Sequence, residues 1–564
     1  MYFKLPLAIV FFFFVLMGLF LVQGHLSKQA ITPKEEKEET HTPDGDMFGT
    51  TAAINGIRAR DLQAHIEFLA DDLLKGRDTG STGAQIAARY VVAQFKRFGL
   101  EPGGENETFY QAVPLTNKQI LPESEMSIEV DGEMIPLKYG DDFLVTGTPA
   151  QSGISLTKRL TFAAFGITAP EYSYDDYDGL DVGDRFVVYL SGEPNSTDST
   201  FFEGTRRSRY SSGRIKRKTA EQDGASAALG IVRDEQLARF SWSRLQGFLS
   251  RPQVRLAEAD VKTGTSSFPG IILHPQVADL IFAGAVSNYE EIERQVSDGS
   301  VKHFSMQKHA NLKIDFVDES VDAENILGFM KGSDPQLQSE IIVFTAHYDH
   351  VGIGTPVAGD SIYNGAADNA SGVSGLLEVA EAFSQLPTPP RRSLLFLVTT
   401  AEEKGLLGSG YYTQHPIFPI AKTVANFNLD MIGIIDTTAM VVYGIERSSL
   451  GNDIRRAARQ FDLRILPDDM PEQRVFFRSD HYNFALKGVP AIFPSFGIQK
   501  SQESIFNEFY HQPSDDANLE WLNYGTMQRQ VQTVFQAALW VANADDPPTW
   551  TAGDEFEKKQ VQQK

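Results

Sequence analysis

Cysteine is absent from the whole 564-residue sequence. Its absence excludes disulfide bonds, zinc sites built on thiolates, a cysteine nucleophile and a lipid-modified cysteine behind a leader. An exported eukaryotic protein of this length would usually contain some cysteine, because oxidising compartments favour disulfides. If the chain is exported, the absence therefore favours a bacterial envelope or periplasm.

Positive charge is also scarce, with 51 Lys and Arg against 74 Asp and Glu and a formal net charge of −23. This acidic balance argues against a general binder of nucleic acids or of anionic membranes. One basic cluster, from Arg206 to Lys218, interrupts it. We interpret this cluster as a solvated loop, with a docking surface as the alternative.

Long apolar runs are missing except at the N-terminus, where residues 5–22 follow Lys4 and end in Val22-Gln23-Gly24. This layout predicts a secretory signal peptide cleaved near Gly24, and its length leaves an uncleaved signal anchor as the alternative. In either case the chain would be exported, to a bacterial periplasm or cell envelope or as a secreted protein. Residues 25–46 are polar and charged, which predicts a flexible tether.

The length of the remaining chain favours two domains. Residues 47–141 and 307–544 alternate helical and strand patterns, which predicts an α/β domain with a mostly parallel central sheet and helices on both faces. Residues 142–306 instead show short β-like runs separated by turns, which predicts an inserted β-rich domain. A polar tail follows at residues 545–564.

Ionisable side chains directly follow three apolar, β-prone runs of the second α/β segment. The runs and the groups behind them are 341–346 with His347, 394–400 with Glu402 and Glu403, and 424–429 with Asp430. In open α/β sheets, sites are built in the crevice outside the carboxyl ends of the strands. The three groups therefore predict an active site at that edge of the sheet.

Two imidazoles and three carboxylates of this region form a candidate ligand set: His347, Asp368, Glu403, Asp430 and His511. Oxygen and nitrogen ligands of this kind suit Zn²⁺, with Mn²⁺ or Co²⁺ as possible substitutes. Two metal ions would need one carboxylate to bridge them, and we assign that place to Asp368.

Three further residues could complete the chemistry. Glu402 points away from its neighbour Glu403, so it could stay free as a general base, although most Glu-Glu pairs lie in surface turns. Asp349 could accept the other ring N–H of His347, or be an ordinary turn aspartate. Tyr510 could donate its hydroxyl to an oxyanion, or be an ordinary core aromatic.

Six motifs of this region occur in a fixed order: His347-Tyr348-Asp349, residues 365–372, residues 401–409, residues 428–433, Ser479-Asp480-His481 and Tyr510-His511. Taken together, they resemble the M28 family of co-catalytic zinc peptidases. In the β-rich segment, Phe165-Gly166-Ile167 and residues 177–182 resemble a protease-associated (PA) domain.

The resemblance implies a role for each position. His347 and Asp430 would hold one zinc ion, Glu403 and His511 the other, and Asp368 would bridge the two. Glu402 would be the base, Asp349 the acid that orients a ligand, and Tyr510 the group that polarises the substrate carbonyl. The substrate pocket would be lined or supported by Ser479, Asp480 and His481.

By this resemblance the protein would be an exported aminopeptidase that cleaves peptides with a hydroxide bridging two zinc ions. A carboxypeptidase for acidic C-terminal residues and glutaminyl-cyclase-like acyl transfer stay as alternatives, as does a non-catalytic binding protein that uses the PA-like domain. The expected partner is a peptide substrate. We expect no nucleic acid, no obligate protein partner, and membrane attachment only through an uncleaved N-terminal anchor.

Overall fold

The computed structural model describes residues 50–149, 151–204, 207–238, 240–257, 268–433, 437–495 and 499–557. The expected leader and tether lie outside the described residues, as do Arg206 of the basic cluster and the tail beyond residue 557. In these ranges no helix combines the length and the apolar character that crossing a membrane requires.

Ten strands form the central sheet. They are β1 (Glu101–Pro102), β2 (Tyr110–Ile120), β11 (Gln253–Leu256), β14 (Phe316–Met330), β15 (Ile341–His347), β18 (Ser393–Thr399), β19 (Thr423–Asn428), β20 (Ala439–Tyr443), β21 (Arg464–Leu466) and β22 (Ala491–Ser495). Their order is β11-β2-β14-β18-β15-β19-β22-β20-β21, and β1 pairs with β14. The predicted strands therefore lie at the centre of the sheet.

The sheet is parallel at its centre and mixed at its flanks. The neighbours β18, β15, β19 and β22 run parallel to one another. On one side β14 joins β18 antiparallel and β2 joins β14 antiparallel, and on the other side β20 joins β22 antiparallel. The carboxyl ends of the four central strands consequently meet at one edge of the sheet.

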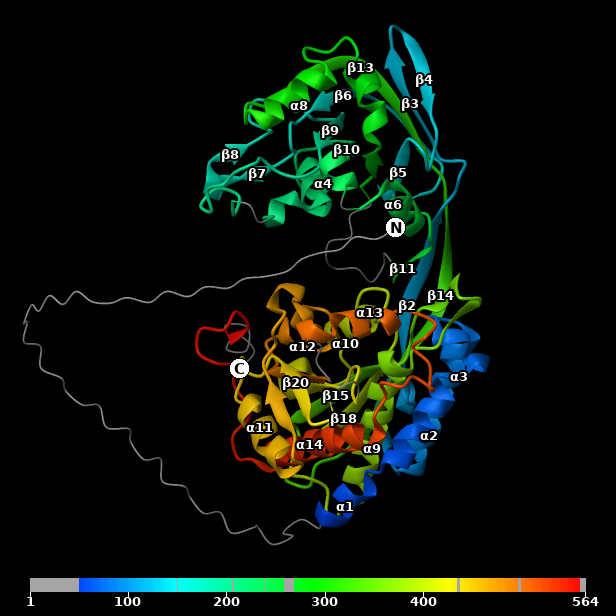
Figure 1. The fold of residues 1–564 in the computed structure, drawn as a ribbon, viewed down its shortest axis with the longest axis vertical. Helices are drawn as coiled ribbons and strands as arrows, with labels where there is room; N and C mark the ends of the chain where they lie inside the picture. The colour runs from blue at the N-terminus through cyan, green and yellow to red at the C-terminus, as the bar shows by residue number, and fades with distance from the viewer. Residues whose placement is uncertain are drawn as a thin grey trace, which may run out of the picture. The chain divides into compact units, whose positions relative to one another are not determined.

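Helices cover both faces of this sheet. One face carries α1 (Thr50–Gly56), α2 (Ala59–Leu69), α3 (Thr82–Arg97), α9 (Ser371–Ser384), α11 (Leu450–Gln460) and α14 (Tyr524–Asn543), and the other carries α10 (Leu407–Gln414) and α12 (His481–Ala485). Figure 1 shows α11, α14 and α9 side by side. Along β15, Ile342 and Phe344 pack into the hydrophobic core on the face that carries α9 and α14. Ile341 and Val343 pack into the core on the face that carries α10 and α12, as the two-residue period of a strand requires.

The β-rich segment builds a second sheet with a hydrophobic core of its own. The sheet order is β4-β3-β13-β6-β9-β10-β12-β5, and its strands begin before residue 142 and end after residue 306. The likeness of this segment to a PA domain stays a prediction. The strands are β3 (Glu125–Val130), β4 (Glu133–Leu137), β5 (Phe143–Gly147), β6 (Ile154–Phe162), β9 (Phe186–Leu190), β10 (Ala227–Ile231), β12 (Gly270–Leu273) and β13 (Phe304–Ile314).

Shorter elements complete the fold. In the β-rich segment they are the strands β7 (Thr168–Ala169) and β8 (Tyr174–Asp175) and the helices α4 (Gly213–Gln222), α5 (Asp234–Leu237), α6 (Trp242–Leu249), α7 (Ala278–Phe282) and α8 (Tyr289–Ser297). Near the predicted site they are the hairpin of β16 (Gly352–Val357) with β17 (Asp360–Tyr363), and α13 (Glu503–Phe509).

The basic cluster is solvated only in part: Arg207, Arg209, Arg214 and Lys218 are exposed, as its composition predicts, but Lys216 is not. The second half of the cluster, from Arg214 to Lys218, lies in helix α4, and Lys216 in that helix is only 1% exposed. The Lys216 ammonium donates to the carbonyls of Phe165 at 2.6 Å, of Leu190 at 3.2 Å and of Gly192. Main-chain carbonyls thus satisfy the buried cation, a contact that the local sequence does not reveal.

Candidate metal centre

The predicted site lies where three central strands end. His347 is the last residue of β15, Glu402 follows β18 by three residues, and Asp430 follows β19 by two. Because these strands are parallel neighbours, their side chains meet in one crevice. The strand pattern thus placed these residues correctly.

Asp368 lies between two histidines. Its Oδ1 is 3.3 Å from Nε2 of His347, and its Oδ2 is 3.2 Å from Nε2 of His511. Gly365, three residues earlier, has a φ of +62°, and a Cβ there would meet the Asp368 carbonyl at 2.2 Å and the ring of His350 at 2.5 Å. Glycine is therefore required for the chain to turn and present Asp368 between the two rings.

Asp430 and Glu403 each lie beside one of these two histidines. Oδ1 of Asp430 is 3.5 Å from Nε2 of His347, and Oε2 of Glu403 is 3.2 Å from Nε2 of His511. The structure thus brings the five predicted ligands together in the predicted grouping, with Asp368 shared. That they bind metal stays a prediction.

His350 also belongs to the site, although it was given no role at the sequence level. Its Nδ1 lies 2.8 Å from Oε1 of Glu403, and its buried Nε2 has no hydrogen-bond partner in the described part of the chain. One ligand atom each from His350, Asp368, Glu403 and His511 lies within 4.8 Å of the others. The only signal in the sequence was the spacing of His350, three residues after His347.

The donor set fits divalent cations. Oδ1 of Asp430 and Nε2 of His511 are buried and have no hydrogen-bond partner among the described residues. Four carboxylates, those of Asp368, Glu402, Glu403 and Asp430, share this space with the imidazoles of His347, His350 and His511. Buried charge of this density requires compensation, and O and N donors of this kind match Zn²⁺ or a similar ion.

The electrostatics of the two neighbouring glutamates differ. Burial raises the pKa of Glu402 well above its ordinary value, and the carboxylates of Glu403 and Asp430 raise it further, against the effect of His347. Burial and the carboxylate of Asp368 also raise the pKa of Glu403, but the adjacent imidazoles of His350 and His511 outweigh them and lower the pKa to about 2. The protein surroundings thus favour the protonated form of Glu402 and the ionised form of Glu403.

Asp349 acts through different atoms than predicted. Nδ1 of His347 faces the main-chain carbonyl of Asp349 at 3.1 Å, not its carboxylate. The carboxylate instead accepts from the Thr79 hydroxyl at 3.0 Å and from the main-chain N–H of Glu402 at 3.1 Å. The chain turns after β15, so the side chain of Asp349 points to the loop behind β18, where it positions Glu402.

Of the three predicted pocket residues, only Ser479 lines the pocket. Asp480 is fully buried and accepts from the Thr399 hydroxyl at 2.5 Å. His481 is also fully buried, with its ring centroid 4.7 Å from that of Phe476, and burial lowers its pKa to about 3. Of the two predicted roles, lining or supporting the pocket, only support remains for His481, because helix α12 begins there and its ring packs 5.2 Å from that of Phe493, which lines the pocket.

Tyr510 lines the pocket and directly precedes the predicted ligand His511. Its ring stacks on that of His511 with centroids 4.0 Å apart, and a guanidinium nitrogen of Arg478 lies 3.4 Å from its hydroxyl. Burial raises the pKa of Tyr510, so the hydroxyl stays protonated at neutral pH. Arg478 was not expected at the site, since the sequence places it only next to the Ser479 motif.

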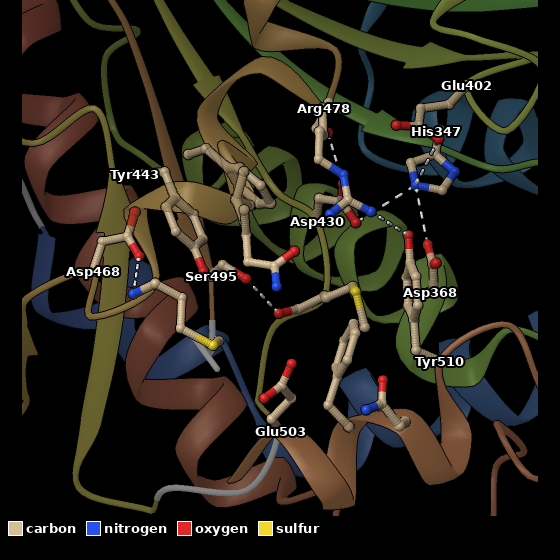
Figure 2. Close-up of a pocket in the computed structure, with 18 residues that line it drawn as sticks. His347, Asp368, Glu402, Asp430, Tyr443, Asp468, Arg478, Ser495, Glu503 and Tyr510 are labelled. Atoms are coloured by element: carbon tan, nitrogen blue, oxygen red, sulfur yellow. Dashed lines mark hydrogen bonds and ion pairs between the residues drawn. The ribbon is translucent and has the colours of Figure 1, made fainter. Parts of the chain in front are cut away.

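A pocket extends away from these ligands. Figure 2 shows it reaching from His347, Asp368 and Glu402 to Tyr443 and Asp468, with Glu503 at another edge. Its walls between these groups are largely apolar or aromatic and come from Met431, Tyr443, Met470, Val475, Phe493 and Phe506. A single large side chain could enter this space next to the ligand cluster.

Comparisons with known proteins agree with this geometry. Residues 325–538 match the family model described as "Peptidase family M28". The chain is 28% identical to "Aminopeptidase YwaD" of Bacillus subtilis, over 43% of this chain and 50% of that protein. It is 33% identical to "Leupeptin-inactivating enzyme 1" of Streptomyces exfoliatus, over 41% of this chain and 51% of that protein. The chain therefore spans about half the length of these curated relatives.

A solved structure shares the fold. It is the "Aminopeptidase from Aneurinibacillus sp. strain AM-1", with a TM-score of 0.51 and 19% identity, covering 88% of this chain and 97% of that one. Residues 325–538, which match the family model, contain all five predicted ligands and Glu402. Residues 325–538 are thus similar in sequence to the M28 peptidases.

Proposed function

We propose that this protein is an exported aminopeptidase that uses two zinc ions to hydrolyse the first peptide bond of a substrate. The observation that carries the proposal is the position of Asp368, whose two oxygens face two different histidines at 3.3 and 3.2 Å. A carboxylate in this position can bridge two ions. His347 and Asp430 would hold one ion, and Glu403 and His511 the other.

The ions, when bound, supply Lewis acidity that polarises a peptide carbonyl and acidifies a water molecule. The protein supplies proton transfer and orientation. Glu402, with its raised pKa, would accept a proton from the attacking water and pass it to the leaving amine. The Tyr510 hydroxyl would donate to the oxygen that becomes negatively charged.

The charge of the pocket supports a free amino terminus as the recognised group. Besides the ligand cluster, the pocket carries the carboxylates of Asp468 and Glu503, with Arg478 as its one cationic group among the described lining residues. An α-ammonium group is attracted to such an environment, whereas an acidic C-terminal residue would meet like charge. The name of one compared relative, the aminopeptidase of Bacillus subtilis, supports the same direction.

Hydrolysis of leucyl-4-nitroanilide beside its N-acetylated form tests the proposal. We expect cleavage of the free-amine substrate alone, loss of activity with a chelator, and recovery when zinc is added back. Equal cleavage of both forms would exclude recognition of the amine. A zinc-loaded protein that cleaves neither form would exclude the aminopeptidase and would favour assays on peptides with acidic C-terminal residues.

A further inference from the structure

Two fully buried, oppositely charged residues lie behind the ligand cluster and are bound almost entirely to main-chain groups. Arg77 is 1% exposed and Asp515 is 0% exposed. Among the described residues, Arg77 forms no ion pair with a carboxylate. Burying a charge in this way is costly unless every polar atom finds a partner. What these two charges hold in place is therefore informative.

The Arg77 guanidinium joins the loops of two predicted ligands. Its Nε donates to the carbonyl of Tyr348 at 2.8 Å, directly after His347. Its terminal nitrogens donate to the carbonyls of Asn364 at 2.6 Å and Gly365 at 2.9 Å, in the turn that leads to Asp368, and to that of Leu69. One planar group thus fixes the start of both loops.

Asp515 holds the same turn from the opposite side. Its Oδ1 accepts from the main-chain N–H of Ala367 at 2.7 Å, and its Oδ2 accepts from that of Asp368 at 3.0 Å. Its own carbonyl accepts from Ala366 at 3.2 Å. Asp515 follows the ligand His511 by four residues, so it ties the third ligand loop to the bridging carboxylate.

The backbone at Arg77 is consistent with such a role. Its φ is +48°, in the left-handed region that non-glycine residues seldom adopt, and Gly76 before it has a φ of +68°. A Cβ at Gly76 would meet the Tyr363 carbonyl at 2.2 Å. The chain therefore accepts a strained turn packed against the loop of Asp368, and strain of this kind is retained where function needs it.

We propose that Arg77 and Asp515 are positioning residues that together set the bridging carboxylate Asp368 between His347 and His511. They touch neither substrate nor metal and act through the main chain of the ligand loops. The inference rests on the proposed metal site. It adds that two-ion binding depends on two buried side chains, Arg77 and Asp515, contributed by the first and last parts of the peptidase fold.

Zinc binding by the full-length protein tests this role. Arg77→Lys keeps the charge but cannot span four carbonyls, and Asp515→Asn replaces one acceptor oxygen with an NH₂ that faces an N–H group. Both variants should bind zinc about 10- to 100-fold more weakly at one or both positions, as losses behind metal ligands usually do. A competing chelating dye measures the affinity, and elemental analysis gives the number of ions bound.

Two matched controls separate positioning from general destabilisation. Arg392 is a fully buried arginine that donates to the carbonyls of Val541, Ala544 and Asp545, beside the start of β18 and so at the opposite end of the sheet. Asp176 is a buried aspartate of the β-rich segment that accepts two main-chain N–H groups. Arg392→Lys and Asp176→Asn should lower the melting temperature and leave zinc affinity unchanged.

The outcomes distinguish the two proposals. If the wild-type protein binds no zinc, the metal site itself is wrong. If it binds two ions, and a folded Arg77→Lys or Asp515→Asn variant binds them equally well, the positioning role is wrong. An equal loss of affinity in the control variants would also overturn it. A lowered kcat for leucyl-4-nitroanilide with unchanged KM would support it, since the pocket walls are untouched.

Discussion

The hydroxyl of Ser479 donates to Oδ2 of Asp430 at 2.6 Å. The amide of Asn428 donates in turn to the Ser479 hydroxyl at 2.8 Å, and the Thr345 hydroxyl donates to the Asn428 carbonyl oxygen at 2.6 Å. This chain of hydrogen bonds occupies one carboxylate oxygen of Asp430 and leaves Oδ1 free beside His347. A predicted pocket residue thus orients a predicted ligand.

Ser479→Ala should therefore weaken metal binding without removing a ligand. The carboxylate of Asp430 would lose its fixed rotamer, and we expect about 10- to 100-fold lower zinc affinity. Ser374→Ala is the matched control. Ser374 lies on α9, is also buried, and donates to the Leu62 carbonyl at 3.0 Å. Unchanged affinity in Ser479→Ala, measured by dye competition, would show that Asp430 needs no such support.

Glu402→Gln should separate catalysis from metal binding. The amide cannot accept a proton, so we expect kcat to fall by about 10²- to 10⁴-fold. The five predicted ligands remain, so the number of zinc ions measured by elemental analysis should stay at two per chain. Loss of one ion together with activity would instead identify Glu402 as a ligand, a possibility raised by its Oε2 lying 4.0 Å from Nε2 of His347.

Tyr510→Phe tests the hydroxyl at the mouth of the site. The ring would still stack on His511, so metal binding should be retained. The donor to the developing oxyanion would be lost, and we expect a decrease in kcat of about 100-fold with little change in KM. A change confined to KM would mean that the hydroxyl contributes only to binding of the ground state.

The sequence predicted the part of the site that depends on local pattern. The apolar runs predicted for the three central strands correspond to β15, β18 and β19 within one residue at each end. Helical periodicity in residues 372–384, 449–461 and 524–542 likewise predicts helices, which correspond to α9, α11 and α14. Once the strands are parallel neighbours, His347, Glu402 and Asp430 must meet, since they follow the same ends.

The remainder depends on contacts between distant segments, which a single sequence does not display. Arg77 and Asp515 meet the loop of Asp368 from opposite ends of the chain, and neither carries a local motif for that contact. The antiparallel flanks β2 and β14 also escaped prediction, because a two-residue period fixes a strand but not its partner. The sequence also did not separate Ser479, which lines the pocket, from His481, which is buried behind it against Phe493.

The charge and the apolar walls of the pocket predict which side chain is preferred at the first residue of the substrate. Asp468 and Glu503 should disfavour acidic side chains, and the apolar walls should favour large ones. We expect kcat/KM for leucyl-4-nitroanilide to exceed that for the glutamyl substrate by at least about tenfold. Asp468→Asn combined with Glu503→Gln should raise the glutamyl rate and leave the leucyl rate nearly unchanged. A wild-type preference for the glutamyl substrate would contradict this assignment of the pocket.

Lys216 predicts a pH dependence of stability in the β-rich segment. Burial lowers the pKa of its ammonium from 10.5 to about 7 in the folded protein, against the effects of Asp176 and Glu193. Between about pH 7 and pH 10.5, the unfolded chain therefore binds a proton that the folded chain has released. Stability must rise with pH in that window, by at most about 1.4 kcal/mol per pH unit.

Lys216→Met removes this titrating group and serves as the comparison. Below pH 7 the lysine is charged in both states, so the difference in melting temperature between the two proteins should be constant there. From pH 7 to pH 9 the wild-type protein should gain stability relative to the variant, because its lysine becomes neutral in the fold while staying charged in the unfolded chain. A constant difference in melting temperature between the two proteins from pH 7 to pH 9 would show that the ammonium keeps its proton in the folded protein, held by the carbonyls of Phe165 and Leu190.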